Sequence, residues 1–386
     1  MLVRDGILIK VYESDIKLLE QNPEKFWEGI TQIGNRAFGE HSDLIKLNIP
    51  NGVTKIWPQA FYACKNLEEI NIPNSVTKIG SQAFYACEDL EKINIPGTSS
   101  LFEIGPAAFC GCINLEKITI SNSVTKIGGG AFFACRNLKE VNIPSSVKKI
   151  EHETFYGCEN LKEINIPSSV KEIDEWAFGN CSNLKEIEVP SGVKKVERGA
   201  FCDCKNLEGI KIPSSLKKIG YWAFGNCNNL KGIEIPYGVE DIGDCAFSGC
   251  VRLQEVKISN SLKRVGRLAF ANCRRLKQIK LPYSLEKISF QAFAGCSKLE
   301  EIDIPNGVTE IGREAFCFCD SLKVVKIPNS VVKLADSVFN NSINLERIQL
   351  PEHLKSCVEM LPSLGYKKLT IEYIKSNEED EELERN

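Results

Sequence analysis

The chain has 386 residues, of which 43% are hydrophobic and 26% charged, and its formal net charge is -3 at pH 7. This near balance of charge gives no reason to expect a polyanion or a membrane surface as a partner. No apolar run reaches the ~18 residues that a membrane-spanning helix needs. Residues Met1 to Gly6 bring in charge before any apolar stretch, so no secretory signal peptide is visible and we expect a protein that is cytoplasmic as synthesised.

Residues 1–27 differ from everything that follows and are predicted to form an N-terminal cap. Ile7 to Val11 reads as a strand, and a helix is predicted to start at Ser14. A stack of repeats needs such an atypical unit at its end, because the core of the first repeat would otherwise face water.

From residue 28 one sequence unit recurs fourteen times. Each step is 23 residues, except for one of 25 residues, and a Leu follows six residues after every repeat Phe. A strict repeat of this length predicts a solenoid, in which each coil buries its apolar face on the next. The repeat phenylalanines are Phe38, Phe61, Phe84, Phe109, Phe132, Phe155, Phe178, Phe201, Phe224, Phe247, Phe270, Phe293, Phe316 and Phe339.

The unit from Leu67 to Cys87 shows what one coil is expected to look like. Ile70 and Ile72 alternate with polar neighbours, which predicts a half-buried strand that Pro73 ends. After a turn, a second short extended segment carries two more apolar residues, and a glycine permits the next bend. Ala83, Phe84 and Cys87 have the spacing of one helical turn and are predicted to form the third side.

Seventeen cysteines suggest a disulfide framework at first sight, but their placement favours another explanation. Twelve of them stand three residues after a repeat Phe, where a small apolar side chain fits, and a free Cys packs as such a residue. The odd total and the lack of a visible export signal favour reduced thiols. The twelve are Cys64, Cys87, Cys112, Cys135, Cys158, Cys181, Cys204, Cys227, Cys250, Cys273, Cys296 and Cys319.

The end of the chain departs from the repeat. The solenoid is predicted to cover residues 28–355 and a C-terminal cap residues 356–375, with a helix from Ser356 to Leu361 and a closing strand from Lys368 to Ile374. Residues 376–386, SNEEDEELERN, are predicted to be a disordered acidic tail.

The consensus L-x-x-I-x-I-P-x-S-V-x-x-I-G-x-x-A-F-x-x-C resembles the BspA-like, or Treponema pallidum-type, leucine-rich repeats over about residues 28–355. The resemblance implies an α/β repeat solenoid. This would be a right-handed leucine-rich-repeat stack of about 14 coils of 23 residues, with a parallel β-sheet on the concave face and short helical turns elsewhere. Members of the family are often bacterial or protozoan surface proteins that bind host matrix proteins or other cells.

The sequence offers little that points to catalysis. The three histidines, His41, His152 and His353, belong to distant repeats, and no nucleophile elbow, phosphate-binding loop or zinc-protease motif is present. Three C-x-C pairs, at Cys110, Cys202 and Cys317, lie four or five repeats apart and do not have the spacing of a structural zinc site. We therefore predict no cofactor and no metal, and we do not expect an enzyme.

In a solenoid the core columns are fixed by packing, so a binding function must use outward positions. The position eight residues after each repeat Phe usually holds a long polar residue, but Gly209 and Gly232 occupy it in two neighbouring repeats. A dent in the sheet beside Lys211 is one interpretation, and ordinary surface variation is the other. The same strands carry outward asparagines, for which a hydrogen-bonded ladder is favoured; these are Asn48, Asn71, Asn94, Asn142 and Asn165.

Aromatic side chains form the second departure from a plain polar surface. Trp176 and Trp222 stand two residues before their repeat Phe, with Tyr221 beside the second, and Tyr237 lies at a nearby turn. Exposed aromatic residues are enriched at interface hot spots. The alternative is that each Trp packs flat over an aliphatic neighbour.

Basic side chains form the third departure. The segment from Arg252 to Lys280 contains nine basic residues and a single acidic one. Its basic residues include Arg264, Arg267, Arg274 and Arg275. Such a run could orient an acidic protein segment, or it could be a solvated surface balanced by acidic repeats. Nucleic acid is not expected, because the run is local and the chain as a whole is negative.

Together these features predict a non-enzymatic scaffold that binds a protein partner through outward positions of the solenoid. The predicted partner-binding residues are Trp176, Gly209, Lys211, Tyr221, Trp222, Gly232, Tyr237, Arg264, Arg267, Arg274 and Arg275. A surface adhesin and an effector exported to bind host proteins remain alternatives, as does an enzyme built on the caps.

Overall fold

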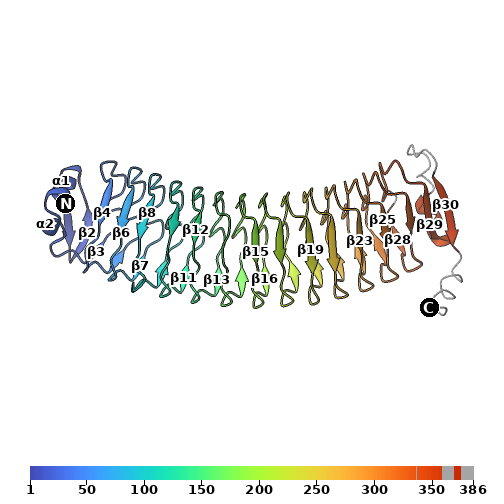
Figure 1. The fold of residues 1–386 in the computed structure, drawn as a ribbon, viewed down its shortest axis with the longest axis horizontal. Coiled ribbons are helices and arrows are strands. Elements are labelled where there is room, and N and C mark those ends of the chain that lie inside the picture. Colours follow the sequence, from blue (N-terminus) through green and yellow to red (C-terminus); the bar gives the residue numbers. More distant parts are fainter. Residues whose placement is uncertain (336, 359–368, 375–386) are drawn as a thin grey trace. The chain divides into compact units, whose positions relative to one another are not determined.

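The computed structural model describes residues 1–335, 337–358 and 369–374, and its coils are shown in Figure 1. They belong to two compact units, Met1–Val193 and Lys194–Asn386, here called the N-terminal and C-terminal units and described separately. In both units a repeat makes one coil. The coil consists of a first strand, a second strand, and a turn segment that carries the repeat Phe.

Strands of successive coils in the N-terminal unit pair in parallel, at a register shift of one repeat. The first strands are β4 (Lys46–Asn48), β6 (Glu69–Asn71), β8 (Lys92–Asn94), β10 (Lys117–Ile118), β12 (Glu140–Val141) and β15 (Glu186–Glu188). The second strands are β3 (Gln32–Ile33), β5 (Lys55–Ile56), β7 (Lys78–Ile79), β9 (Glu103–Ile104), β11 (Lys126–Ile127), β13 (Lys149–Ile150) and β14 (Glu172–Ile173).

The C-terminal unit repeats the same arrangement. Its first strands are β17 (Gly209–Lys211), β19 (Gly232–Ile235), β21 (Glu255–Ile258), β23 (Gln278–Lys280), β25 (Glu301–Asp303), β27 (Val324–Lys326) and β29 (Arg347–Pro351). The second strands are β16 (Lys195–Val196), β18 (Lys218–Ile219), β20 (Asp241–Ile242), β22 (Arg264–Val265), β24 (Lys287–Ile288), β26 (Glu310–Ile311) and β28 (Lys333–Leu334).

Burial within a coil follows the apolar columns of the sequence. Ile70, Ile72, Val76, Ile79 and Phe84 are each at most 1% exposed, whereas the side chains between them point outward. Each coil therefore has a continuous apolar interior that only neighbouring coils can cover. This confirms the predicted solenoid of stacked coils with parallel strands.

The turn segment differs from the expected helical turn. Gln82 and Ala86 have positive φ angles of 56° and 55°. The N–H groups of Ala83 and Tyr85 donate to carbonyls of the same coil, while the N–H of Phe84 donates to Ala108 of the next coil at 2.7 Å. Because every second N–H points to the next coil, this third side is also a ladder between coils, which a helix cannot provide.

Repeat phenylalanines form stacks through the core of each unit. The rings of Phe61 and Phe84 are 5.0 Å apart at 4°. In the C-terminal unit the rings of Phe247 and Phe270 are 5.3 Å apart at 7°. Both rings of each pair are fully buried, so these phenylalanines contribute much of the apolar area that holds successive coils together.

The cysteine column is buried, as predicted, and it has a further role. All twelve of its members are 0% exposed. The thiol of Cys87 donates to the carbonyl of Phe61 in the preceding coil at 3.1 Å, and Cys250 does the same to Phe224 at 3.2 Å. Burial raises the pKa of Cys250 from 9.0 to about 12, so its thiol stays protonated at neutral pH. The column therefore supplies both packing and a weak hydrogen bond between coils.

We predict that few of these thiols react in the folded protein. All seventeen cysteines are free, and only Cys110 and Cys357 are more than marginally exposed. A thiol reagent at pH 8 should therefore label about two groups in the native protein, because the reactive species is the thiolate. Under denaturing conditions it should label nearly all seventeen. Mass spectrometry that finds many disulfides in unreduced protein would contradict this prediction.

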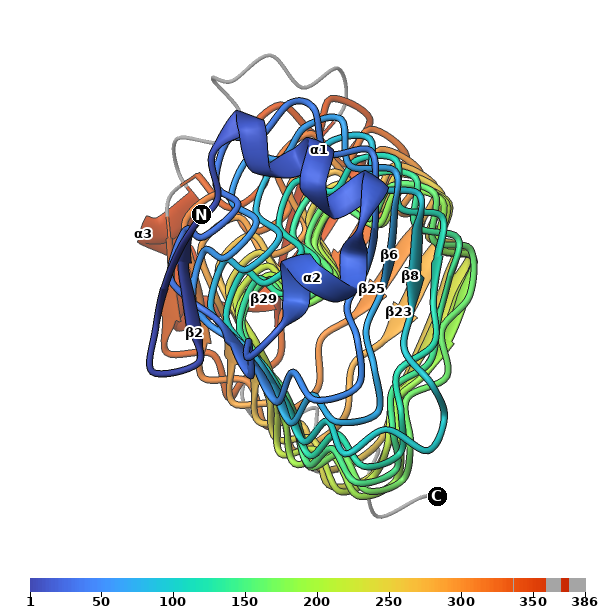
Figure 2. The same ribbon diagram turned by 90° about the vertical axis from the view of Figure 1, so that its left-hand side faces the viewer.

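The N-terminal end carries the predicted strand and helix, with boundaries that differ slightly. β1 (Leu2–Arg4) and β2 (Ile7–Lys10) form a hairpin, followed by α1 (Glu13–Gln21) and α2 (Pro23–Trp27), which Figure 2 shows at the end of this unit. The helix starts before Ser14, because the carboxylate of Asp15 accepts a hydrogen bond from the N–H of Tyr12 at 2.9 Å.

At the other end, a short helical stretch and a parallel strand follow the last coil. The elements are a 3-10 turn, Glu352–Leu354, the helix α3 (Lys355–Val358), and β30 (Thr370–Ile374), which pairs in parallel with β29. The predicted helix overlaps α3, and the rest of its range lies outside the described residues. So does the predicted acidic tail. The predicted domain boundaries stay a prediction.

Candidate functional site

Outward side chains of the first strands β17, β19, β21, β23, β25 and β27 in the C-terminal unit form the surface that we call the strand face. They stand eight and ten residues after the repeat Phe and flank a buried residue, as Gln278 and Lys280 flank Ile279, which is 4% exposed. The period of two along a strand dictates this arrangement. The strand face consists of Gly209, Lys211, Gly232, Glu234, Glu255, Lys257, Gln278, Lys280, Glu301, Asp303, Val324 and Lys326.

A shallow groove of about 810 Å³ lies on the strand face over β21, β23, β25 and β27. Its floor is apolar and includes Ile279 and Ile302, and its walls are charged. Val324 is 47% exposed here, between Glu301 and Arg347 on the neighbouring strands. An apolar centre with a polar rim is the composition typical of a protein–protein interface.

The two predicted glycines lie on the strand face, where the space beside them is open. A Cβ at Gly209 would meet nothing within 4 Å, and one at Gly232 would meet only the carbonyl of Glu255, at 3.7 Å. Among the described strands, β17 and β19 belong to different hydrogen-bonded sheets, so the ladder is interrupted between these glycines. Side chains of the strand face are therefore missing at this point, as the sequence predicted, and a binding role for this place stays a prediction.

The tryptophans lie on the turn segment, away from the strand face. Trp222 has a φ of 56°, and its ring lies so close over Gly225 that a Cβ there would be 2.7 Å from Cε3. In the N-terminal unit Trp176 lies over Gly179 and meets the edge of the Tyr156 ring at 6.3 Å. Each Trp thus fills space that a glycine leaves empty and has a packing role on that side.

Tyrosines provide the more exposed aromatic surface. Tyr237 is 75% exposed at the turn between first and second strands, and Tyr283 is 71% exposed at the same turn two coils later. Tyr221 is 42% exposed and has the guanidinium of Arg198 5.1 Å from its ring centre. The strand face, the tyrosine turn and the tryptophan side are three different parts of the coil, so the predicted residues do not form one patch.

The predicted basic run is likewise spread around the coil. Arg264 lies on β22 and is held by Asp241 at 2.9 Å and Asp244 at 3.4 Å. The guanidinium of Arg267 lies 5.2 Å from the centre of the Phe290 ring. Arg274 and Arg275 are exposed at the turn that precedes β23. Only the last two are therefore available to a partner without giving up a contact described here.

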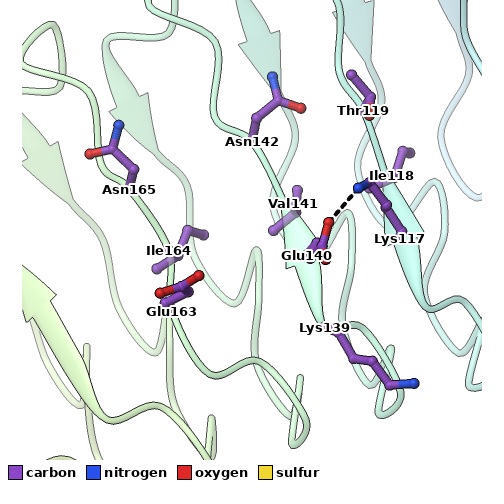
Figure 3. A pocket seen from close by; sticks show the side chains of 10 residues that line it. All are labelled: Lys117, Ile118, Thr119, Lys139, Glu140, Val141, Asn142, Glu163, Ile164 and Asn165. Carbon is purple, nitrogen blue, oxygen red and sulfur yellow. Dashed lines mark ion pairs between the residues drawn. The ribbon is translucent and has the colours of Figure 1, made fainter.

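The corresponding side of the N-terminal unit has a pocket of about 560 Å³, seen in Figure 3. Lys117 pairs with Glu140 across neighbouring coils, while Glu163 has no ion pair among the described residues. The amide of Asn142 donates to the carbonyl of Ile120 and accepts from its N–H, so it replaces a backbone bridge. The predicted asparagine ladder is therefore confined to Asn48, Asn71 and Asn94, which bond in series.

One group of potential metal ligands occurs in the described residues, at Glu151, His152 and Asp174 of the N-terminal unit. Lys149 already lies among them, with its Nζ 3.2 Å from Glu151 and 2.8 Å from Asp174. The hydrogen bond with Asp174 raises the pKa of Lys149, so the cluster carries its own cation. This arrangement is an ion-pair network, and a metal ion would have to displace the lysine.

Sequence reasoning missed two features of the C-terminal unit. The first is exposed Val324, which stands where most repeats have a polar residue. The second is the pair of lysine doublets, Lys194-Lys195 and Lys217-Lys218, which neighbouring coils place side by side. Their recurrence 23 residues apart is visible in the sequence, but only the coil register shows that they share one side.

Comparisons with known proteins agree with this architecture. Residues 31–161, 148–277 and 240–361 match the model described as a BspA type leucine rich repeat region. A leucine-rich repeat protein from Bacteroides ovatus is 31% identical over 90% of this chain and 88% of its own, with a TM-score of 0.68. A leucine rich cell surface protein from Faecalibacterium prausnitzii is 29% identical over 78% and 86%, with a TM-score of 0.52.

A T. pallidum leucine rich repeat protein is 29% identical over 52% of this chain and 82% of its own, with a TM-score of 0.36. No protein with a curated description matches the chain. Among the described residues, no helix is both long and apolar enough to cross a membrane.

Proposed function

Because the chain belongs to the BspA-type leucine-rich repeat family, we propose that it is a non-enzymatic scaffold that binds a protein partner through the outward positions of its C-terminal unit. The groove on the strand face is the observation that carries this proposal, since it combines an apolar floor, charged walls and exposed Val324. A stacked array of coils is preorganised, so docking costs little conformational entropy.

Catalysis has less support from the structure than partner binding has. The best-defined group of titratable side chains, Glu151, His152 and Asp174, is held by Lys149. His41 and His353 lie close to backbone carbonyls, at 2.9 Å from Val11 and 2.8 Å from Val331. Each of these two histidines contacts a backbone carbonyl of its own, and the two are not arranged around a common site.

A role at the cell surface is the second candidate. The similarity to the leucine rich cell surface protein from F. prausnitzii supports it. Antibody labelling of intact source cells, compared with permeabilised cells, separates the two locations. Labelling that requires permeabilisation would count against a surface role and leave the scaffold proposal unchanged.

We predict that reversing one charge in the groove weakens partner binding. The partner would first be isolated by chemical cross-linking, identified and purified. In calorimetric titrations, Glu301→Lys should then cost more than about 1 kcal/mol, the level of a contributing interface residue. Glu301 lies in the wall of the groove, where a partner would meet it directly.

Glu163→Lys is the matched control for this experiment. Glu163 has the same position in its coil and is also exposed, but it belongs to the N-terminal unit. This variant should bind within about 0.5 kcal/mol of the wild type, as surface substitutions usually do. If Glu163→Lys abolished binding while Glu301→Lys did not, the proposed surface would be on the wrong unit.

A further inference from the structure

The ladders that join successive coils are not continuous along the N-terminal unit. Its second strands pair in one sheet that ends at β11, and β13 begins another. Its first strands pair in a sheet that ends at β12, and residues 163–166, one repeat later, form no strand. The turn at residues 144–146 lies between both interruptions. It divides the unit into residues 1–143 and 147–193, here called the first and second segments.

Main-chain hydrogen bonds on the strand side stop at this turn. Within the first segment, the N–H of Gly128 donates to the carbonyl of Ile104 at 2.9 Å. The N–H of Glu151, one repeat later, has no acceptor among the described residues, and neither do the N–H groups of residues 163–166. Main-chain groups without a protein partner must bond to water. The strands on either side of this turn therefore do not hold each other.

Ion pairs on the strand side follow the same division. Lys126 on β11 pairs with Glu103 of the preceding coil at 3.7 Å, whereas Lys149 on β13 pairs with Asp174 of the following coil at 2.8 Å. In the part of the chain that the structure describes, no ion pair joins β11 to β13. Val141, at the open edge of β12, is partly exposed, although the corresponding residue of β10 is buried. Each segment thus pairs its own charges on this side.

The turn segments, in contrast, stay joined across this division. The N–H of Phe132 donates to Thr154 at 2.9 Å, and that of Ala134 donates to Tyr156 at 2.7 Å. The rings of Phe132 and Phe155 stack at 5.5 Å and 3°. The main-chain ladders therefore hold the two segments together on one side of the coil only.

We infer that the turn at residues 144–146 is a hinge, at which the strand sides of the two segments separate while their turn segments stay in contact. The retained ladder and the stacked rings form the axis, and the unpaired strands are free to move. A hinge needs a few residues that absorb the change in backbone angles, and a turn between two strands supplies them. The hinge concerns the N-terminal unit and does not depend on the proposed partner of the C-terminal unit.

The pocket in Figure 3 lies at this opening, because its lining comes from both segments. Glu140 and Asn142 belong to the first segment, and Glu163 and Asn165 belong to the second. Movement at the hinge therefore changes the width of this pocket and the exposure of Val141, which also lines it. Burial of apolar surface favours the closed form in water, so the open form is the minor state of an equilibrium.

Hydrogen exchange of the full chain, with and without one core substitution, tests the hinge. Phe109→Ala removes a ring that is 0% exposed and stacks on Phe84 at 5.2 Å and on Phe132 at 5.5 Å, all within the first segment. Because the coils of an unbroken stack support one another, the loss of stability should spread through the first segment. Weak coupling between the segments should stop it at the hinge.

Two N–H groups lie equally far from Phe109 in the repeat and serve as matched reporters. The N–H of Gly34, three coils earlier, donates to Leu8 at 2.8 Å, and that of Asp174, three coils later and beyond the hinge, donates to Ile150 at 3.0 Å. In urea below the unfolding transition, Phe109→Ala should accelerate exchange at Gly34 by at least about tenfold, given the usual cost of a lost core ring. Exchange at Asp174 should stay within about twofold of the wild type.

Equal acceleration at Gly34 and Asp174 would overturn the inference, because the N-terminal unit would then open as one block. If Phe109→Ala unfolds the first segment outright, Gly34 loses all protection and Asp174 must still keep its own. The axis of the hinge has a separate test in the wild type. The N–H groups of Phe132 and Ala134 should exchange as slowly as those inside either segment. Exchange at the rate of an unprotected N–H would show that the segments separate completely and do not hinge.

Discussion

Raising the pH from 8 to 11 should unfold the protein, through the ionisation of its buried cysteine column. Burial raises the pKa of eleven column thiols above the ordinary value of 9.0, and for Cys181, Cys250 and Cys296 it reaches about 12. The unfolded chain therefore loses these protons first. The stability that the thiols confer is complete below about pH 9 and falls as the pH rises toward 12.

The size of this effect follows from the number of thiols. Each one removes about 1.4 kcal/mol of unfolding free energy per pH unit above its unfolded pKa. Eleven thiols together remove roughly 15 kcal/mol by about pH 10, as much as the whole stability of a typical domain. Far-ultraviolet circular dichroism, recorded under reducing conditions along a pH titration, should show a steep transition. A native spectrum at pH 11 would contradict the prediction.

Ser342 provides the design of a matched variant, because it occupies the cysteine position in the last repeat. Its hydroxyl donates to the carbonyl of Phe316 at 2.7 Å, as the thiols of other coils do to theirs. A hydroxyl does not ionise in this pH range. Cys250→Ser should therefore move the alkaline midpoint upward, whereas replacement of the half-exposed Cys357 should leave it unchanged.

Phe247→Ala should lower the free energy of unfolding by about 3–5 kcal/mol, the usual cost of deleting a core aromatic residue. The ring of Phe247 is 0% exposed and stacks on Phe224 and on Phe270 at 5.3 Å each. Because a coil is covered only by its neighbours, the cavity should loosen adjacent coils as well. Urea titration measures the total loss, and hydrogen exchange shows how far it spreads.

Tyr237→Ala is the control for this core variant. Tyr237 lies in the same coil as Phe247, at the turn between β19 and β20, and is 75% exposed. Its removal should change the stability by no more than about 0.5 kcal/mol. A loss below about 1 kcal/mol for Phe247→Ala would show that the stacked phenylalanines are not what holds the coils together.

The interior of each coil could be predicted from the sequence because every core position recurs. The positions of Ile70, Val76 and Phe84 recur with the repeat along the chain. Such a column of apolar residues is buried only when successive coils stack on one another. The burial of the cysteines followed from the same argument. The prediction of a helical turn around Phe84 differed from the structure, because it considered spacing within one coil and not hydrogen bonds between coils.

The candidate site was harder to predict, because its properties depend on which outward side chains meet across coils. In the sequence Arg264 looks like a free cation, but in the structure it forms ion pairs with Asp241 and Asp244. The sequence left open whether Trp222 is an exposed anchor or packs on a neighbour, and the structure places its ring over Gly225. The two lysine doublets are visible in the sequence, but only the register of the coils shows that Lys195 and Lys218 lie side by side.

The proposed scaffold function is tested most directly by hydrogen exchange of the C-terminal unit in the presence of the purified partner. The proposed scaffold function predicts slower exchange in β23, β25 and β27, which underlie the groove. The turn segments around the repeat phenylalanines should be unchanged. Protection confined to those turn segments, or to the N-terminal unit, would contradict the proposed binding surface.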